Sequence, residues 1–125
     1  MTDVCPIVVD VKAEYSVEHS ESEQNRFVFI YHITIHNAGD QAAQLLSRHW
    51  LITDGNGMVE EVMGDGVIGE QPMILPGKAH QYESFCMLET NVGYMQGSYQ
   101  MLSKDGEAFD AQVPAFTLAA PGALN

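Results

Sequence analysis

The sequence predicts an all-β domain built as a two-sheet β-sandwich. Between residues 27 and 36, apolar residues occupy alternate positions and many are β-branched or aromatic, which is the pattern of a half-buried strand. Shorter runs of this kind recur along the chain, separated by turn-forming residues. No segment has a convincing helical repeat. About seven or eight short strands are typical of a sandwich or a barrel, and their irregular spacing favours the sandwich.

The first predicted strand is the short β-branched run at residues 7–11. The acidic segment 16–25 follows it and is expected to form a mobile loop or a hairpin tip. In the strand at 27–36, one face carries only aromatic and β-branched residues and the other is mixed, so one face is expected to enter the core. Residues 37–40 end this strand with turn chemistry.

Residues 41–52 fit either a helical stripe or a strand. We prefer the strand because residues 54–57, with the sequence DGNG, are a tight hairpin signal, and 58–63 then form the returning strand. Trp50, the only tryptophan, is expected to anchor the core rather than an interface, because tryptophan is mostly buried.

The segment 64–77 is predicted to be an ordered, winding loop, because it is rich in glycine and contains two prolines. Tyr99 and Met101 are expected to point inward from a later strand, and Pro114 predicts an edge strand or a bulge. One domain spans residues 1–125, with its core at about 7–118. The remaining strands are predicted at 81–88, 94–102 and 109–118, followed by a loose tail at 119–125.

The chain is strongly acidic. Five Lys and Arg face seventeen Asp and Glu, which gives a formal net charge of −12 with histidine neutral. The basic residues are scattered singly, so no basic patch can neutralise nucleic-acid phosphates or an anionic membrane. A basic protein surface or a cation suits this charge better, although an acidic surface also serves solubility alone.

Targeting and redox signals are sparse. The N-terminal residues lack the basic region and apolar run of a signal peptide, and no stretch has the ~20 apolar residues of a membrane helix. Cys5 and Cys86 form no C-x-x-C motif, so we expect neither a zinc knuckle nor a disulfide framework. The cytoplasm is the expected compartment.

The string GDGVIG at residues 64–69 matches the G-x-G-x-x-G pattern of dinucleotide sites. In those sites a helix follows the loop and its N-terminus holds the pyrophosphate. Pro72 and Pro76 prevent such a helix here, and the neighbouring Asp65 and Glu70 would repel phosphate. Binding of an anion by the backbone amides of the loop stays open, beside the simpler reading that the glycines serve backbone geometry.

No metal or catalytic constellation is evident. His32 and His36 share a strand face but lie roughly 13 Å apart, too far for one ion. Oxygen-only, weak binding of a divalent cation by Glu60, Glu61, Asp65 and Glu70 remains open, although the order of a calcium loop is missing. There is no G-x-S-x-G elbow, so we expect no enzyme activity and no cofactor.

Several segments carry a family likeness: LSRHWLITDG at 46–55, EVMGDGVIGEQP at 61–72, LPG at 75–77, Tyr82, Ser84, MQGSYQM at 95–101 and VPAFTL at 113–118. Together they resemble the ApaG family, and the likeness runs from about Ile7 to Leu118. The resemblance implies an immunoglobulin-like or fibronectin type III-like sandwich, agreeing with the pattern above. It also implies a bacterial cytosolic protein linked to cobalt and magnesium resistance or efflux, with no agreed catalytic residues.

We therefore expect a non-enzymatic binding module that engages a protein partner through a sandwich face or the 64–77 loop. The edge strand near Pro114 also allows a homodimer. The alternative function is binding of a nucleotide or pyrophosphate, as a divalent-metal chelate, at 64–69. The residues expected to contact the ligand or partner are Gly64, Asp65, Gly66, Gly69, Gln71, Arg48 and His49.

Overall fold

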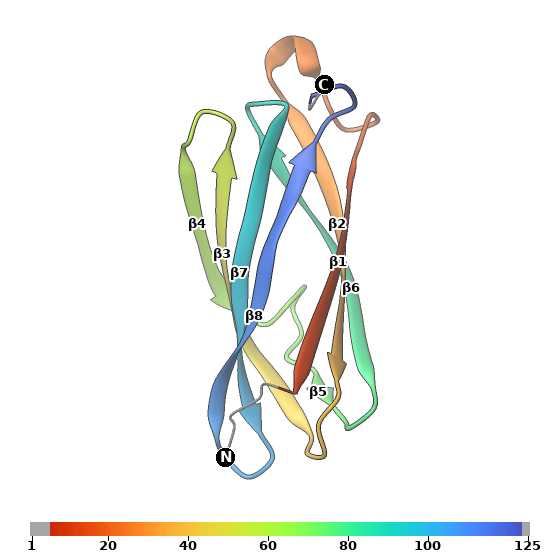
Figure 1. Ribbon diagram of the computed structural model, residues 1–125, viewed down its shortest axis with the longest axis vertical. Helices are drawn as coiled ribbons and strands as arrows, with labels where there is room; N and C mark the ends of the chain where they lie inside the picture. Colours follow the sequence, from red (N-terminus) through yellow and green to blue (C-terminus); the bar gives the residue numbers. More distant parts are fainter. Residues whose placement is uncertain (1–5, 124–125) are drawn as a thin grey trace.

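The computed structural model describes residues 6–123 and confirms the predicted all-β sandwich (Figure 1). Two antiparallel sheets lie face to face, and their strands run along the long axis of the molecule. The smaller sheet has the order β1–β2–β6, with β1 at Ile7–Tyr15, β2 at Phe27–Asn37 and β6 at Ala79–Leu88. The larger sheet has the order β4–β3–β7–β8, with β4 at Val59–Asp65, β3 at Ala43–Asp54, β7 at Val92–Ser103, β8 at Ala108–Ala119, and the short β5 at Met73–Ile74 beside β3.

The connectivity is immunoglobulin-like. Strands β1, β2 and β6 correspond to A, B and E of that fold, and β3, β7 and β8 correspond to C, F and G. Strand β4 adds to the second sheet beside β3, as a C′ strand does. After β4 the 64–77 loop leads the chain back to the larger sheet at β5, and the chain then crosses to the smaller sheet to form β6 (Figure 1).

Aromatic side chains fill the centre of the core around Trp50, as predicted for an anchor. The indole ring contacts Tyr31, Tyr99 and Phe116, with ring centroids 5.9 to 6.0 Å apart and planes steeply inclined. Such edge-to-face contacts add about 0.5–1.5 kcal/mol each beyond area burial. Tyr99 and Met101 point inward from β7, as expected, and both are fully buried.

The segments that were uncertain in the sequence have clear structures. Residues 41–52 contribute β3, so the choice of a strand over a helix is confirmed. Pro114 lies on the edge strand β8, where the register with β7 shifts between Met95 and Gly97, so the predicted edge and bulge both exist. The acidic segment 16–25 belongs to the connection between β1 and β2 and contains the 3-10 helix η1 (Ser22–Gln24).

Two expectations need adjustment. The 64–77 loop contains the two-residue strand β5, which pairs with Ala43 and Gln44 at the start of β3. In the segment expected to be a loose tail, Ala119 ends β8, and buried Ala120 donates its N–H to the carbonyl of Asn91 at 2.9 Å. Cys5 and residues 124–125 lie outside the described part of the chain.

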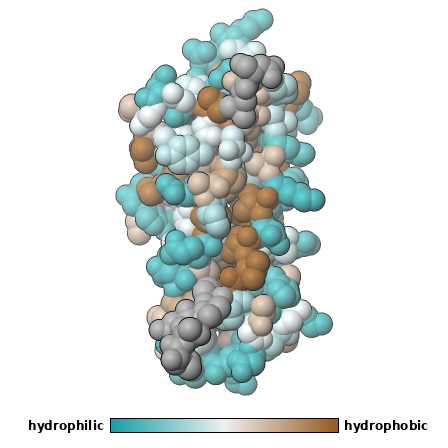
Figure 2. All heavy atoms as spheres, viewed as in Figure 1, coloured by the Kyte–Doolittle hydropathy of each residue, from teal (hydrophilic) through white to brown (hydrophobic). Residues whose placement is uncertain are grey.

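The sandwich has two flanks where edge strands of different sheets face each other. On one flank β1 lies beside β8, and Figure 2 shows apolar side chains gathered over the lower part of this seam. On the other flank β4 and the 64–77 loop face β6; we call this the open flank. Within residues 6–123 no helix is long and apolar enough to cross a membrane.

Candidate functional site

The 64–77 loop is fastened to β3 at both of its ends. The N–H of Gly66 donates to the carbonyl of Leu46 at 2.8 Å, and Leu45 N–H donates to the carbonyl of Pro72 at 3.0 Å. The side-chain amide of Gln71 reaches the same Leu46 carbonyl at 2.9 Å. This carbonyl is free to accept two bonds because β3 has a register shift between Leu45 and Ser47. The loop is therefore an ordered part of the fold.

A tight turn forms the tip of the loop. Val67 and Glu70 exchange backbone hydrogen bonds of 2.8 and 3.0 Å, and the two residues between them have positive φ, 48° at Ile68 and 76° at Gly69. Positive φ at both central positions defines a type I′ turn, which strongly prefers Asn-Gly. A β-branched residue there is an outlier. Yet Ile68 occupies the strained position with its side chain 62% exposed.

The three glycines of the motif serve different purposes. At Gly66, a Cβ atom would lie 2.3 Å from the carbonyl oxygen of Glu70, so only glycine fits. At Gly64 a Cβ would lie 2.9 Å from the Arg48 guanidinium, which therefore packs against this backbone. Gly69 has open space around it and is needed only for its positive φ.

The loop does not form the anion-binding cradle that is typical of G-x-G-x-x-G motifs. The N–H groups of Gly66, Val67 and Glu70 all donate to carbonyls of the protein itself. Only Ile68 and Gly69 retain N–H groups without a backbone acceptor at this tip. A nest needs several successive amides directed at one point, and this turn does not supply them.

Arg48 of β3 binds the backbone of the 64–77 loop through its guanidinium group. Its Nη1 donates to the carbonyl oxygens of Asp65 at 3.1 Å and of Gly66 at 2.9 Å. Behind these contacts lies a cavity of about 230 Å³, which opens on the open flank. We call it the Arg48 cavity, and its walls come from both sheets and the loop: Tyr31, Arg48, Trp50, Asp65, Val67, Ile68, Gly69, Tyr82 and Ser84.

Tyrosine hydroxyls surround the base of the Arg48 cavity. Tyr82 and Tyr99 share a hydrogen bond of 2.5 Å between their hydroxyl oxygens, and Tyr31 lies opposite Ser84 in the pairing of β2 with β6. Burial raises the pKa of all three phenols, and the positive charge of Arg48 opposes this rise at each of them. The phenols are thus neutral donors and acceptors at physiological pH, and Arg48 supplies the positive charge of the site.

The structure brings most of the predicted contact residues together. Gly64, Asp65, Gly66, Gly69, Gln71 and Arg48 all belong to the loop or its attachment to β3. His49 does not, because adjacent strand residues point to opposite faces. Its Nε2 pairs with Glu61 Oε2 at 2.6 Å on the outer face of the larger sheet.

Sequence reasoning missed the residues that complete the cavity from the other sheet. Tyr82 and Ser84 alternate with outward residues along β6, which predicts their inward direction. Their meeting with Arg48 depends on how the two sheets are packed, and the sequence carries no direct signal for that.

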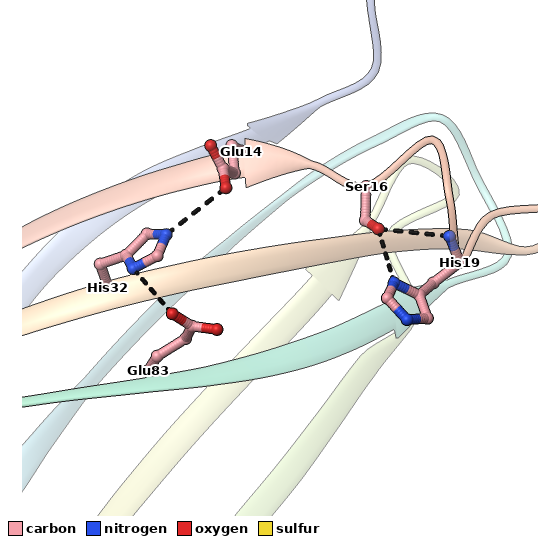
Figure 3. A network of polar contacts seen from close by, with 5 residues as sticks. All are labelled: Glu14, Ser16, His19, His32 and Glu83. Atoms are coloured by element: carbon pink, nitrogen blue, oxygen red, sulfur yellow. Dashed lines mark hydrogen bonds and ion pairs between the residues drawn. The ribbon is translucent and has the colours of Figure 1, made fainter.

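A network of polar contacts also lies on the outer face of the smaller sheet (Figure 3). His32 on β2 contacts Glu14 of β1 through Nε2 at 3.5 Å and Glu83 of β6 through Nδ1 at 3.3 Å. Close to it, Ser16 Oγ bonds His19 Nδ1 at 2.8 Å and accepts the His19 N–H at 3.2 Å, which closes a local turn. Across residues 6–123, no three His, Cys, Asp or Glu side chains are grouped to hold a metal ion.

The fold and the loop together define a class of protein, an immunoglobulin-like β-sandwich whose C′-to-E crossing is an ordered, glycine-rich loop. The ApaG domain model matches residues 17–103. Protein ApaG from Azotobacter vinelandii is 59% identical over 119 residues, covering 95% of this chain and 94% of that protein. Protein ApaG from Pseudomonas aeruginosa is also 59% identical, over 117 residues, covering 94% of this chain and 93% of that protein. The chain belongs to the ApaG family.

Solved structures agree with this assignment. A Bordetella pertussis protein described as ApaA superposes with a TM-score of 0.91 at 41% identity, covering 93% of this chain and 94% of that one. A structural genomics target superposes with a TM-score of 0.89 at 50% identity, covering 94% and 89% of the two chains.

Proposed function

We propose that this protein is a non-enzymatic binding module that contacts a protein partner through the open flank, with Ile68 as its central apolar contact. The supporting observation is Ile68 itself. A non-glycine residue in the left-handed region costs about 1–3 kcal/mol, and such strain concentrates at ligand-contacting sites. An asparagine at this position would adopt the positive φ of the turn at a lower cost in free energy. We therefore infer that the apolar side chain of Ile68 serves contact with a partner.

The distribution of exposed apolar side chains supports the same surface. Large apolar side chains at the surface are normal singly, whereas their concentration marks an interaction site. Of the eleven that are exposed in the described chain, three line one depression on this flank, between the two sheets: Met58 of the β3–β4 turn, Val59 of β4 and Met87 of β6.

The alternative function, binding of a nucleotide or pyrophosphate by the loop amides, has less support. Three of the N–H groups that it would use donate to protein carbonyls. The carboxylates of Asp65 and Glu70 flank the turn, and the only nearby cation, Arg48, is already attached to the loop backbone.

The test is capture of partners from an extract of the source cells on immobilised protein, comparing the wild type with Ile68→Asn. The variant keeps the turn and removes the apolar side chain, so it should capture at least about tenfold less partner than the wild type. Because asparagine relieves the strain, the free energy of unfolding should rise by about 1 kcal/mol. Val17→Asn is the matched control, because Val17 is an exposed apolar residue of the β1–β2 connection and belongs to none of β4, the 64–77 loop and β6. Equal capture by wild type and Ile68→Asn would refute the proposal.

We propose further that any effect of the protein on cobalt or magnesium resistance passes through this partner. Cells carrying Ile68→Asn should then show the resistance of a deletion strain, while Val17→Asn cells behave as wild type. If Ile68→Asn cells keep full resistance after losing the partner, the two roles are separate.

A further inference from the structure

Arg48 has no carboxylate partner within residues 6–123, although acidic residues outnumber basic ones by seventeen to five in the sequence. Among the described residues, the only ion pairs involve His32 and His49. Both bonds of Arg48 go from Nη1 to carbonyl oxygens, which carry no net charge. A guanidinium has five N–H donors, so Nε and Nη2 retain three without a partner in residues 6–123.

The surroundings favour an anion at these remaining donors. Arg48 is partly buried and lines the cavity between the sheets, where the lower dielectric strengthens an ion pair. Tyr31, Trp50 and Val67, all buried, form the apolar walls, and the hydroxyl groups of Tyr82 and Ser84 supply neutral donors. A volume of about 230 Å³ corresponds to roughly seven or eight water molecules at ~30 Å³ each, enough for an acidic group and the atoms that carry it.

We propose that the Arg48 cavity binds one carboxylate group, presented by the protein partner on an acidic side chain or at its C-terminus. Nε and Nη2 form the planar fork that a carboxylate accepts in a bidentate manner. The inference rests on the proposed function, because Ile68 forms part of the rim of this cavity and would contact the chain that carries the carboxylate.

A carboxylate fits this site better than a phosphate. Arg48 is the only Lys or Arg that lines the cavity. Its single positive charge balances the one negative charge of a carboxylate but not the two of a phosphate dianion. The exposed Asp65 also lines it and would repel a second negative charge. Of the backbone amides at the loop tip, those of Gly66, Val67 and Glu70 donate to protein carbonyls and are not available to complete a phosphate site.

Trp50 makes the proposal measurable, because it is the only tryptophan and lines the cavity. The protein is titrated at constant ionic strength with N-acetylglycine, which mimics a chain terminus, with the α-amide of N-acetylaspartate, which mimics a side chain, and with inorganic phosphate. N-acetylglycinamide is the neutral control. Indole fluorescence and the Arg48 Nε–H resonance are the readouts.

We expect one or both carboxylates to give saturable changes at millimolar concentration, and the one that saturates first identifies the source. Arg48→Lys keeps the charge but removes the fork, so it should weaken this binding at least about tenfold. Ser84→Ala, which leaves the loop and Arg48 intact, should weaken it less. Arg26→Gln should have no effect, because Arg26 donates to the His19 carbonyl in the β1–β2 connection.

Saturation by phosphate alone, or no saturation by either carboxylate, would overturn the proposal, as would binding that survives in Arg48→Lys. The proposed function is judged separately by Ile68→Asn. If that variant loses its partner while no carboxylate binds the wild type, the module stands and the carboxylate site fails. If a carboxylate binds the wild type while Ile68→Asn captures as much partner as the wild type, the carboxylate site stands and the proposed function fails.

Discussion

Tyr82 and Tyr99 join the two sheets through a hydrogen bond of 2.5 Å between their hydroxyl oxygens, beneath the Arg48 cavity. Tyr82 belongs to β6 of the smaller sheet and Tyr99 to β7 of the larger sheet. Their rings are 6.5 Å apart and nearly perpendicular, and Tyr99 also packs edge-to-face on Trp50. The Arg48 cavity thus lies on a fixed base.

Tyr82→Phe should destabilise the protein more than Tyr99→Phe. Tyr99 is fully buried, and within residues 6–123 its hydroxyl bonds only to Tyr82. Tyr82→Phe therefore leaves a buried polar group without a partner, at a cost of about 1–3 kcal/mol. Tyr82 lines the cavity, where water can replace the lost partner. Urea unfolding of both single variants and of the double variant measures this.

The double variant is the internal control. Removing both hydroxyls leaves no orphaned group, so it should be no less stable than Tyr82→Phe alone. Additive losses in the double variant would show that the two hydroxyls act independently.

Alanine substitutions should separate the glycines of the loop motif. Gly66→Ala should destabilise the protein by more than about 2 kcal/mol, because the new Cβ meets the Glu70 carbonyl in addition to the strain of positive φ. Gly69→Ala, with open space, should cost only about 1–2 kcal/mol of strain. Thermal unfolding of both variants tests this order, and equal losses would contradict it.

The fold could be predicted because its signals are local. The alternation in β2 and the hairpin residues after β3 depend only on neighbouring residues. The prediction for β1 ended at Val11, four residues before the strand does, because Lys12 and Glu14 on the outer face interrupt the apolar run. In β3 the register shift between Leu45 and Ser47 changes which residues face the core. Strict alternation from the buried Trp50 would place Leu45 on the outer face, whereas Leu45 is fully buried.

The site could be predicted only in part, because its two halves come from different sheets. The glycine pattern indicated the 64–77 loop, and Arg48, which was predicted with it, contacts that loop; its role in binding stays a prediction. The cavity walls from Tyr31, Tyr82 and Ser84 arise from sheet packing, a long-range arrangement that no spacing in the chain encodes. The sequence does not indicate Ile68, because its strain lies in a backbone angle that only the structure shows.

Cys86 should make the protein sensitive to alkaline pH. Burial raises the pKa of its thiol to about 12, from 9.0 for an ordinary thiol, and the negative charge of Glu60 adds to the rise. Above pH 9 the unfolded chain releases this proton while the folded chain retains it, so stability falls as pH rises. Between pH 7 and pH 10 the thiol should remove about 1.4 kcal/mol of stability, about 1 kcal/mol of it above pH 9.

The measurement is urea unfolding at pH 7 to 10 for wild type and Cys86→Ala, both in a Cys5→Ser background. Cys86→Ala lowers stability by a constant amount through lost packing, but its curve should be flatter above pH 9 than that of the wild type. Curves that stay parallel would refute the role of this thiol. The window ends at pH 10 because the buried tyrosines then begin to contribute with the same sign.

The last prediction concerns Co²⁺. His32 with Glu14 and Glu83 is the richest set of exposed donors on the smaller sheet, but the two carboxylates contact different ring nitrogens, at 3.5 and 3.3 Å (Figure 3). One ion therefore meets a single nitrogen and a single carboxylate, fewer protein ligands than the three or four of a specific site. Calorimetric titration should show only millimolar affinity, reduced further in His32→Thr, and EDTA should leave the midpoint of thermal unfolding unchanged. A saturable micromolar site that His32→Thr abolishes would show that side chains rearrange around the ion and would contradict this geometry.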